Sequence, residues 1–118
     1  MVRIESSFTL DQLMEFSKST YEAFSVKSRL RKHAYYRQVA AYLAVEGGCK
    51  LKHIAKAFGV SHPTIIWSRD NATSRLISKD EKFMTYYIDF VDKFNKHLNQ
   101  KTANELPTTI DEGEPVNA

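Results

Sequence analysis

Hydrophobic positions recur every three or four residues over most of this chain, which is the period of an amphipathic helix. A first helix is predicted to start after Thr9, because Thr9 and Gln12 have the spacing of a capping box. The positions expected on the buried face of this helix are Leu13, Phe16, Thr20 and Phe24. The first part of the chain is therefore predicted to be helical.

Two further helices are predicted before and after a pair of glycines. The second helix covers about residues 34–46 and ends at Gly47 and Gly48, since glycine commonly follows the last helical residue. The third is short, from residue 51 to residue 58, and Gly59 and Val60 form the turn that follows it. These short connections predict helices that pack closely together.

A fourth helix is predicted to begin after Ser61, which is a favourable N-cap residue, and to run to about Ile77. Pro63 lies in its first turn, where the missing N–H costs no hydrogen bond. The residues expected to be buried are Ile65, Ala72 and Leu76. Residues 64–67 have the composition of a short strand, but the sequence contains no second strand to pair with it.

The last helix is predicted to begin at a capping box formed by Ser78 and Glu81 and to end at about Leu98. After it the composition changes to Pro, Thr and acidic residues with few apolar ones, which is typical of disorder. The sequence thus predicts an all-α fold, a compact bundle of about five helices. Residues 1–100 form a single domain, and residues 101–118 form a disordered acidic C-terminal tail.

The charge is distributed unevenly along the 118 residues, although the net charge is only +3. Residues 27–101 carry fifteen basic and six acidic side chains, whereas residues 102–118 carry four acidic and no basic ones. A basic folded region is the electrostatic pattern expected for a partner rich in phosphate. The alternative is a basic surface that is simply solvated.

Several classes of protein are excluded by residue content. The single cysteine, Cys49, cannot form an internal disulfide, and one cysteine with four scattered histidines does not have the spacing of a metal site. The longest apolar run, residues 39–45, is too short to span a membrane. No pairing of nucleophile and base or of two carboxylates is recognisable. We therefore expect a cytoplasmic protein that is not an enzyme and binds no metal, cofactor or membrane.

Residues 51–76 have the spacing of a helix-turn-helix. Ala55 is small where the two helices approach each other, Gly59 supplies the positive φ of the turn, and Ile65 fills the angle between the helices. An ordinary helical hairpin with a glycine turn has the same pattern. The polar start of the fourth helix, flanked by basic charge, favours the helix-turn-helix.

Two stretches of the chain resemble the C-terminal DNA-binding domain of the bacterial replication initiator DnaA. The first is the basic run at residues 27–32 (KSRLRK), followed by an Arg-Gln helix start with alanine-rich turns at residues 36–44 (YRQVAAYLA). The second is Phe58-Gly59 followed by His62-Pro63-Thr64 and two isoleucines. The resemblance covers about residues 19–98. The sequence contains no Gly-rich phosphate loop, so we expect a stand-alone domain without the ATPase module and without a bound nucleotide.

The resemblance implies that Arg37 enters the DNA minor groove, where the negative potential favours an inserted arginine. The basic residues expected near phosphates are Arg29, Arg31 and Lys32, together with Lys52 and Lys56 on the third helix. The alternative for Arg37 is that it caps its helix or pairs with an acidic residue such as Glu46. For the lysines the alternative is a solvated face.

Base reading is expected from the start of the fourth helix. The residues that point away from its buried side are Ser61, His62, Pro63, Ile66, Trp67 and Asp70. By the resemblance, His62 and Thr64 contact base edges, and Pro63 and Ile66 are suited to a thymine methyl group. The alternatives are an ordinary exposed histidine, a Thr64 that only caps the helix, and a Trp67 buried in the core.

The sequence departs from the family pattern near this helix. It is one residue shorter between Gly59 and His62, Val60-Ser61 replaces an Arg-Asp pair, and Pro63 replaces a base-reading threonine. Asp70 occupies a position that is usually basic. These changes leave open whether the same DNA box is bound.

The sequence therefore predicts sequence-specific binding of double-stranded DNA, related to a replication origin or to transcription. The alternative is a protein-interaction module that keeps the helix-turn-helix as a scaffold. In that case Ile66 and Trp67 form a hydrophobic docking patch for a protein partner.

Overall fold

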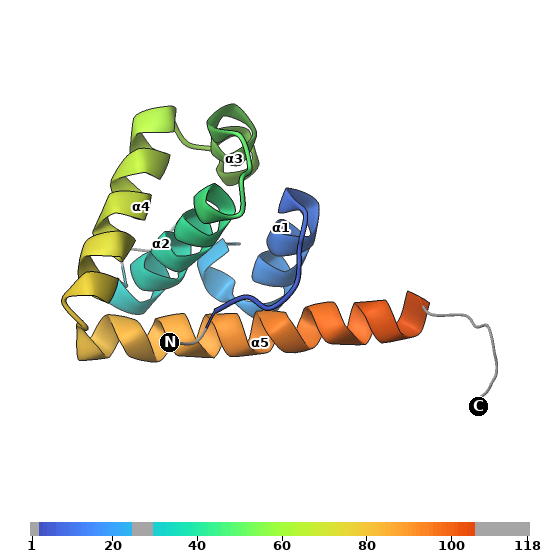
Figure 1. The fold of residues 1–118 in the computed structure, drawn as a ribbon. Coiled ribbons are helices and arrows are strands. Elements are labelled where there is room, and N and C mark those ends of the chain that lie inside the picture. The colour runs from blue at the N-terminus through green and yellow to red at the C-terminus, as the bar shows by residue number, and fades with distance from the viewer. Residues whose placement is uncertain (1–2, 25–29, 106–118) are drawn as a thin grey trace.

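The structure is a computed structural model that describes residues 3–24 and 30–105. Within these ranges every regular element is helical, which confirms the all-α prediction (Figure 1). The elements are α1 (Leu10–Thr20), the short 3-10 helix η1 (Glu22–Phe24), α2 (Arg31–Glu46), α3 (Leu51–Phe58), α4 (His62–Ile77) and α5 (Glu81–Glu105). Residues 106–118, most of the predicted tail, lie outside the described ranges.

Helix α2 is the central element of the fold, since it packs against α1, η1, α3, α4 and α5. The long helix α5 runs beneath the other helices, and α4 rises from the N-terminal end of α5 with α3 at its far end (Figure 1). No helix within the described ranges combines the length and apolar character that a membrane span requires.

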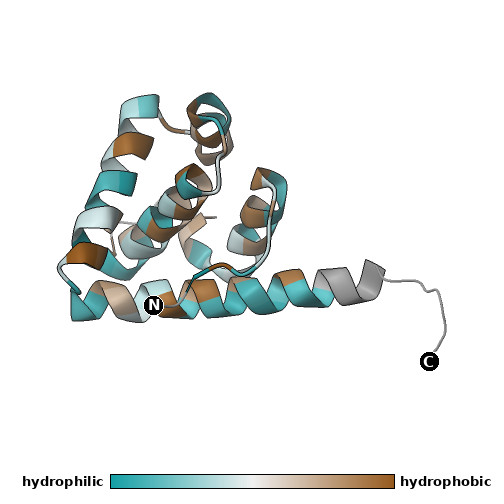
Figure 2. Cartoon of the chain, viewed as in Figure 1, coloured by the Kyte–Doolittle hydropathy of each residue, from teal (hydrophilic) through white to brown (hydrophobic). Residues whose placement is uncertain are grey.

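The core is built from aromatic residues of α5 and small residues of α2. Phe83, Phe90 and Phe94 are fully buried on one side of α5, and Phe16 of α1 contacts the last two with ring centroids 5.3 Å and 5.0 Å away. On α2 the buried positions include consecutive alanines, which let neighbouring helices approach closely. Each helix carries both hydrophobic and hydrophilic positions, as expected for helices that share one core (Figure 2).

The predicted capping boxes have different outcomes. Thr9 and Gln12 form the reciprocal box, with the Thr9 hydroxyl accepting from the Gln12 N–H and the Gln12 amide oxygen accepting from the Thr9 N–H. The prediction of a capping box at Ser78 and Glu81 is wrong, because Ser78 is the C-cap residue of α4. At the start of α5 the Asp80 carboxylate accepts a hydrogen bond from the Phe83 N–H instead, at 3.1 Å. A carboxylate placed there satisfies one of the free N–H groups at the start of α5.

Three predicted boundaries also need correction. Thr20 is exposed and ends α1, so Phe24 belongs to η1 and not to the buried face of the first helix. Helix α2 begins at Arg31, three residues earlier than predicted. Helix α5 continues to Glu105, past the predicted end near Leu98 and into the predicted tail.

A polar network on Asp89 joins three parts of the chain. The Tyr21 hydroxyl donates to Asp89 Oδ2 at 2.7 Å, and the Tyr36 hydroxyl donates to the same oxygen at 3.2 Å. Lys93 Nζ lies 3.2 Å from Asp89 Oδ1. The rings of Tyr21 and Tyr36 are stacked, with centroids 4.1 Å apart. One carboxylate therefore ties the end of α1 and the start of α2 to the middle of α5.

The network shifts the pKa of its members in opposite directions. Burial, followed by the charge of Asp89 and the hydrogen bond to it, raises the pKa of Tyr36 to about 12. Burial and the hydrogen bond to Asp89 raise the pKa of Tyr21 further. Burial acts to raise the pKa of Asp89, but the hydrogen bonds from Tyr21 and Lys93 outweigh it and hold the pKa below its usual value. The folded state therefore favours neutral tyrosines beside an ionised aspartate.

We expect the free energy of unfolding to fall as the pH rises from 10 towards 12. In this window the tyrosines of the unfolded chain lose their protons, whereas the raised pKa keeps Tyr36 protonated in the folded chain. The unfolded state then binds fewer protons than the folded state, so stability declines with pH. Urea unfolding at several pH values measures this slope. Y36F should flatten it, and an identical slope in the parent protein and Y36F would contradict the assignment.

Candidate nucleic-acid interface

Helices α3 and α4 form the predicted helix-turn-helix. Gly59 ends α3 in the left-handed conformation, with φ 70° and ψ 34°, and the Val60 N–H donates to the Ala55 carbonyl at 3.0 Å. Ala55 of α3 and Ile65 of α4 are both buried. The helix α4 then begins at His62 with Ser61 as its N-cap. The positive φ predicted for Gly59 is confirmed, and Ala55 and Ile65 are buried as their predicted roles require.

The start of α4 projects its side chains into solvent. Ser61, His62, Pro63 and Thr64 are all exposed. The Ser61 and Thr64 hydroxyls are 2.9 Å apart, and Ser61 Oγ also accepts from the Thr64 N–H at 3.4 Å. The Thr64 hydroxyl thus takes part in the helix cap, and its remaining hydrogen-bonding capacity faces outward.

Two large apolar side chains continue this outward surface along α4. Ile66 is 38% exposed and Trp67 is 60% exposed, and Val60 in the turn is 40% exposed. The structure therefore places Trp67 at the surface and not in the core. Below, the exposed surface formed by residues 60–64, 66 and 67 is called the α4 face.

Basic side chains on α3 lie close in sequence to this turn. Lys52 and Lys56 are exposed on the same side of α3, four residues apart. No carboxylate among the described residues forms an ion pair with either lysine. Both ammonium groups are therefore available to an anionic partner.

Arg69 of α4, unlike these lysines, forms an ion pair with Asp70. Arg69 Nε donates to Asp70 Oδ1 at 2.7 Å, and the Asp70 side chain is 62% exposed. An anionic partner near this part of α4 meets a paired arginine and a carboxylate.

The basic residues near the start of α2 are only partly described. Arg31 and Lys32 are exposed in the first turn of α2, whereas Arg29 lies outside the described residues. Arg37 is half-buried, and its Nη1 donates to the Ala23 carbonyl at 3.0 Å. Arg37 thus stabilises η1, and its insertion into a minor groove stays a prediction.

An aromatic contact connects η1 to the helix-turn-helix. The rings of Phe24 and Phe58 meet edge to face, with centroids 6.2 Å apart. Phe24 comes shortly before the basic run of the sequence, and Phe58 directly precedes Gly59. The end of η1 therefore lies beside the turn between α3 and α4.

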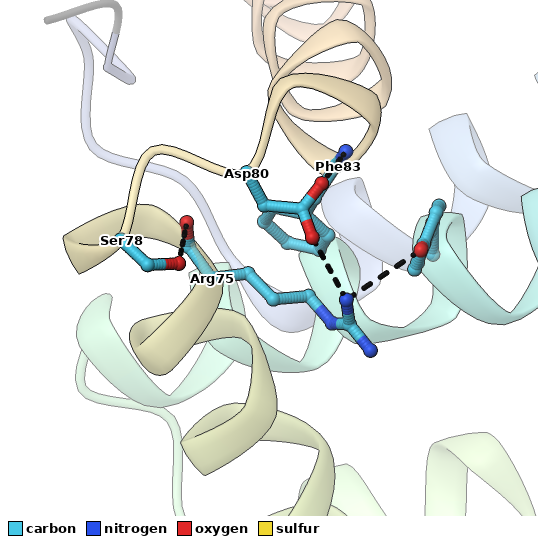
Figure 3. A network of polar contacts seen from close by, with 5 residues as sticks. Arg75, Ser78, Asp80 and Phe83 are labelled. Carbon is cyan, nitrogen blue, oxygen red and sulfur yellow. Dashed lines mark hydrogen bonds and ion pairs between the residues drawn. The ribbon is translucent and has the colours of Figure 1, made fainter.

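A second polar cluster fixes the C-terminal end of α4, as Figure 3 shows. Arg75 Nη1 donates to Asp80 Oδ2 at 3.1 Å and to the Tyr35 hydroxyl at 3.5 Å, and its guanidinium lies 5.0 Å from the Tyr35 ring centroid. The hydrogen bond from the Phe83 N–H and the charge of Arg75 lower the pKa of Asp80 against the effect of burial. The cluster joins α4 to α2 and α5.

Sequence reasoning did not identify the polar contacts of Arg75, Asp80 and Asp89. For Asp80 a signal was present, since an aspartate three residues before Phe83 has N-cap spacing. For Asp89 there was none, because its partners Tyr21 and Tyr36 are 68 and 53 residues away along the chain.

The geometry defines a helix-turn-helix protein whose second helix exposes its N-terminal residues. Residues 10–71, just over half of the chain, match the family described as "Bacterial dnaA protein helix-turn-helix", and the chain belongs to that family. No curated protein and no solved structure matches the chain.

The range of the match corrects the extent of the resemblance. It begins with α1 and not at residue 19, and it ends within α4 and not at residue 98. Helix α5, which supplies much of the core, therefore lies outside the matched residues.

We expect G59V to destabilise the domain by roughly 1–3 kcal/mol, because a β-branched residue is strained at positive φ. A Cβ at this position would meet no atom within 4 Å outside the adjacent residues, so the variant tests backbone strain more than a clash. Denaturant unfolding followed by circular dichroism measures the loss. G59N is the matched control, since asparagine tolerates the left-handed region. Equal stability of G59V and G59N would show that φ is not the constraint.

Proposed function

We propose that this protein binds double-stranded DNA sequence-specifically, with α4 in the major groove. The observation that carries the proposal is the exposed α4 face, which follows the Gly59 turn of the helix-turn-helix. The chain also belongs to a family of helix-turn-helix domains. A helix of this kind reads base edges with the residues of its N-terminal part. The protein then acts by binding, and the proposal assigns it no catalytic step and no cofactor.

The charges at the helix starts support an anionic partner. Helices α1 and α5 carry an acidic residue in the first turn, Asp11 and Glu81, whereas α2, α3 and α4 carry none. Arg31 and Lys32 stand in the first turn of α2, where the helix dipole disfavours positive charge. Phosphate groups near these helix starts would relieve that repulsion.

Several exposed residues have a chemical role in this proposal. His62 and Thr64 hydrogen-bond to base edges or to a phosphate, while Pro63 and Ile66 contact thymine methyl groups. Lys52 and Lys56 contact the backbone phosphates on one side of the turn. Arg37, whose Nη1 donates to the Ala23 carbonyl, is the residue for which the resemblance implies insertion into the minor groove.

Two biological roles fit this proposal: marking a replication origin and regulating transcription. In either role the protein would act in the cytoplasm. Both roles need a protein that recognises a particular site. The shortened turn, Pro63 and Asp70 favour a site that differs from the family's usual one.

A second candidate function is docking to a protein through the apolar part of the α4 face. The observation that favours it is the exposure of Trp67, at 60%, beside Ile66 and Val60. Binding through such a patch would persist at salt concentrations that abolish DNA binding. The salt dependence of binding to mixed DNA fragments therefore separates the two functions.

We expect H62A and K52A to weaken DNA binding in different ways. H62A should cost roughly 1–3 kcal/mol on a site selected from random oligonucleotides, with little loss on random DNA. K52A should weaken binding to both DNAs and reduce the slope of log affinity against log salt by about one. Fluorescence anisotropy on both DNAs measures the contrast.

K96A is the control for removal of one positive charge, because Lys96 lies on α5 and pairs with Asp92. Its affinity for both DNAs should stay close to that of the parent protein. If K52A and K96A behave alike and H62A does not alter site preference, α4 does not read DNA, and the protein-docking function takes its place.

We expect D70N to bind DNA more tightly than the parent protein, by several-fold at low salt. The substitution removes a carboxylate that repels phosphate and frees Arg69, 2.7 Å away, for a backbone contact. D92N, which frees an exposed lysine on α5, is the matched control and should change affinity much less. A loss of affinity in D70N on a selected site would instead indicate that Asp70 accepts a hydrogen bond from a cytosine amino group.

A further inference from the structure

Asp89 lies on α5, outside the residues that match the family, yet its contacts lead to the family's DNA-binding elements. Its carboxylate accepts hydrogen bonds from two tyrosine hydroxyls and forms an ion pair with Lys93. All three interactions involve the negative charge of Asp89. Charge-assisted hydrogen bonds of this kind are stronger and more directional than neutral ones. The position of the carboxylate therefore determines where the two tyrosines lie.

The first branch runs from Tyr21 towards the helix-turn-helix. Tyr21 is the C-cap residue of α1 and directly precedes η1. Two residues later the Ala23 carbonyl accepts the hydrogen bond from Arg37, and the next residue, Phe24, packs against Phe58. Fixing Tyr21 therefore fixes η1, and η1 contacts the last residue of α3 before the Gly59 turn.

The second branch runs from Tyr36 along α2. Tyr36 is followed by Arg37 and lies about one turn after Arg31 and Lys32 on the same helix. The hydrogen bond to Asp89 and the stacking on Tyr21 fix the rotation of α2 relative to η1. The basic side chains of α2 are thereby held in a defined position relative to α3 and α4.

We infer that Asp89 is a positioning residue for DNA binding, which rests on the function proposed above. It holds the basic start of α2 and the helix-turn-helix in one relative arrangement, so that phosphates and base edges are contacted together. Helix α5 thus contributes to DNA affinity without touching DNA.

The sign of the effect distinguishes this role from general electrostatics. Removing a negative charge from a DNA-binding protein raises its affinity if charge alone matters. We expect D89A to lower affinity by roughly threefold to thirtyfold, the range seen for residues that couple distant sites. D92A removes the same charge one turn later on α5, from an exposed pair with Lys96, and should leave affinity unchanged or raise it.

The experiment measures affinity for a selected DNA site at several salt concentrations, at a temperature where circular dichroism shows every variant to be folded. Titration at high protein concentration gives the active fraction, which corrects for any unfolded protein. The salt slope of D89A should be smaller by about one for each phosphate that the variant no longer neutralises, a change that lower stability alone does not produce. D89N should recover part of the affinity, since its amide oxygen still accepts from the tyrosines.

A double variant, Y21F with Y36F, tests the same interactions from the other side. It removes only the two hydroxyls that donate to Asp89 and keeps the stacked rings. It should lower DNA affinity by about as much as D89A does. The triple variant should lose little more affinity than D89A alone, because both changes remove the same interactions. If D89A does not fold, the affinity of the Y21F/Y36F variant tests the positioning role of Asp89.

The outcomes are separable. If the parent protein does not bind DNA, the proposed function fails and the inference fails with it. If the parent binds and D89A matches D92A in affinity and salt slope, the positioning role alone is overturned. A folded Y21F/Y36F variant that binds as the parent does also overturns it.

Discussion

The fold depends on how closely the other helices can approach α2. Val39, Ala40 and Ala44 are fully buried on this helix, and Ala72 is fully buried on α4. Small side chains at such positions bring two helix backbones near each other, and a larger residue there would force them apart. Because α2 contacts every other helix, the placement of α4 relative to the basic start of α2 follows from this packing. The proposed DNA-binding surface is in that sense a consequence of the alanines of α2.

Four aspartates of the folded region form ion pairs within the protein. Asp70, Asp80, Asp89 and Asp92 each pair with a basic side chain, and these pairs neutralise Arg69, Arg75, Lys93 and Lys96. Within the described part of the chain, the basic residues that form no ion pair include Arg31 and Lys32 on α2 and Lys52 and Lys56 on α3. The basic charge of the sequence therefore indicates a phosphate-rich partner. The ion pairs within the fold determine which basic side chains stay available to that partner.

Local features of the fold could be predicted from the sequence, and long-range ones could not. The Thr9 cap, the Gly59 turn and the Ser61 cap depend on residues within four positions of one another. At Ser78 and Asp80 two cap residues compete, and Arg75 from the previous helix favours Asp80 through a contact that no local pattern reveals. The Asp89 network joins residues more than fifty positions apart. Sequence spacing also predicted which α4 residues face outward, while the contact between Arg37 and Ala23 depends on tertiary structure.

The departures from the family pattern affect the outward face of α4 and leave the scaffold intact. Ile65, Ala72 and Leu76 keep α4 packed against the bundle, so its outward side chains can change while the fold is kept. The resemblance implies that Pro63 and Asp70, which pairs with Arg69, stand there in place of the family's hydrogen-bonding and basic groups. Apolar contacts to thymine methyl groups depend on shape and position and carry no charge, so they add specificity without adding to nonspecific affinity. A surface of this composition depends more heavily on the correct placement of the cations that form no ion pair, and we infer that Asp89 of α5 maintains that placement.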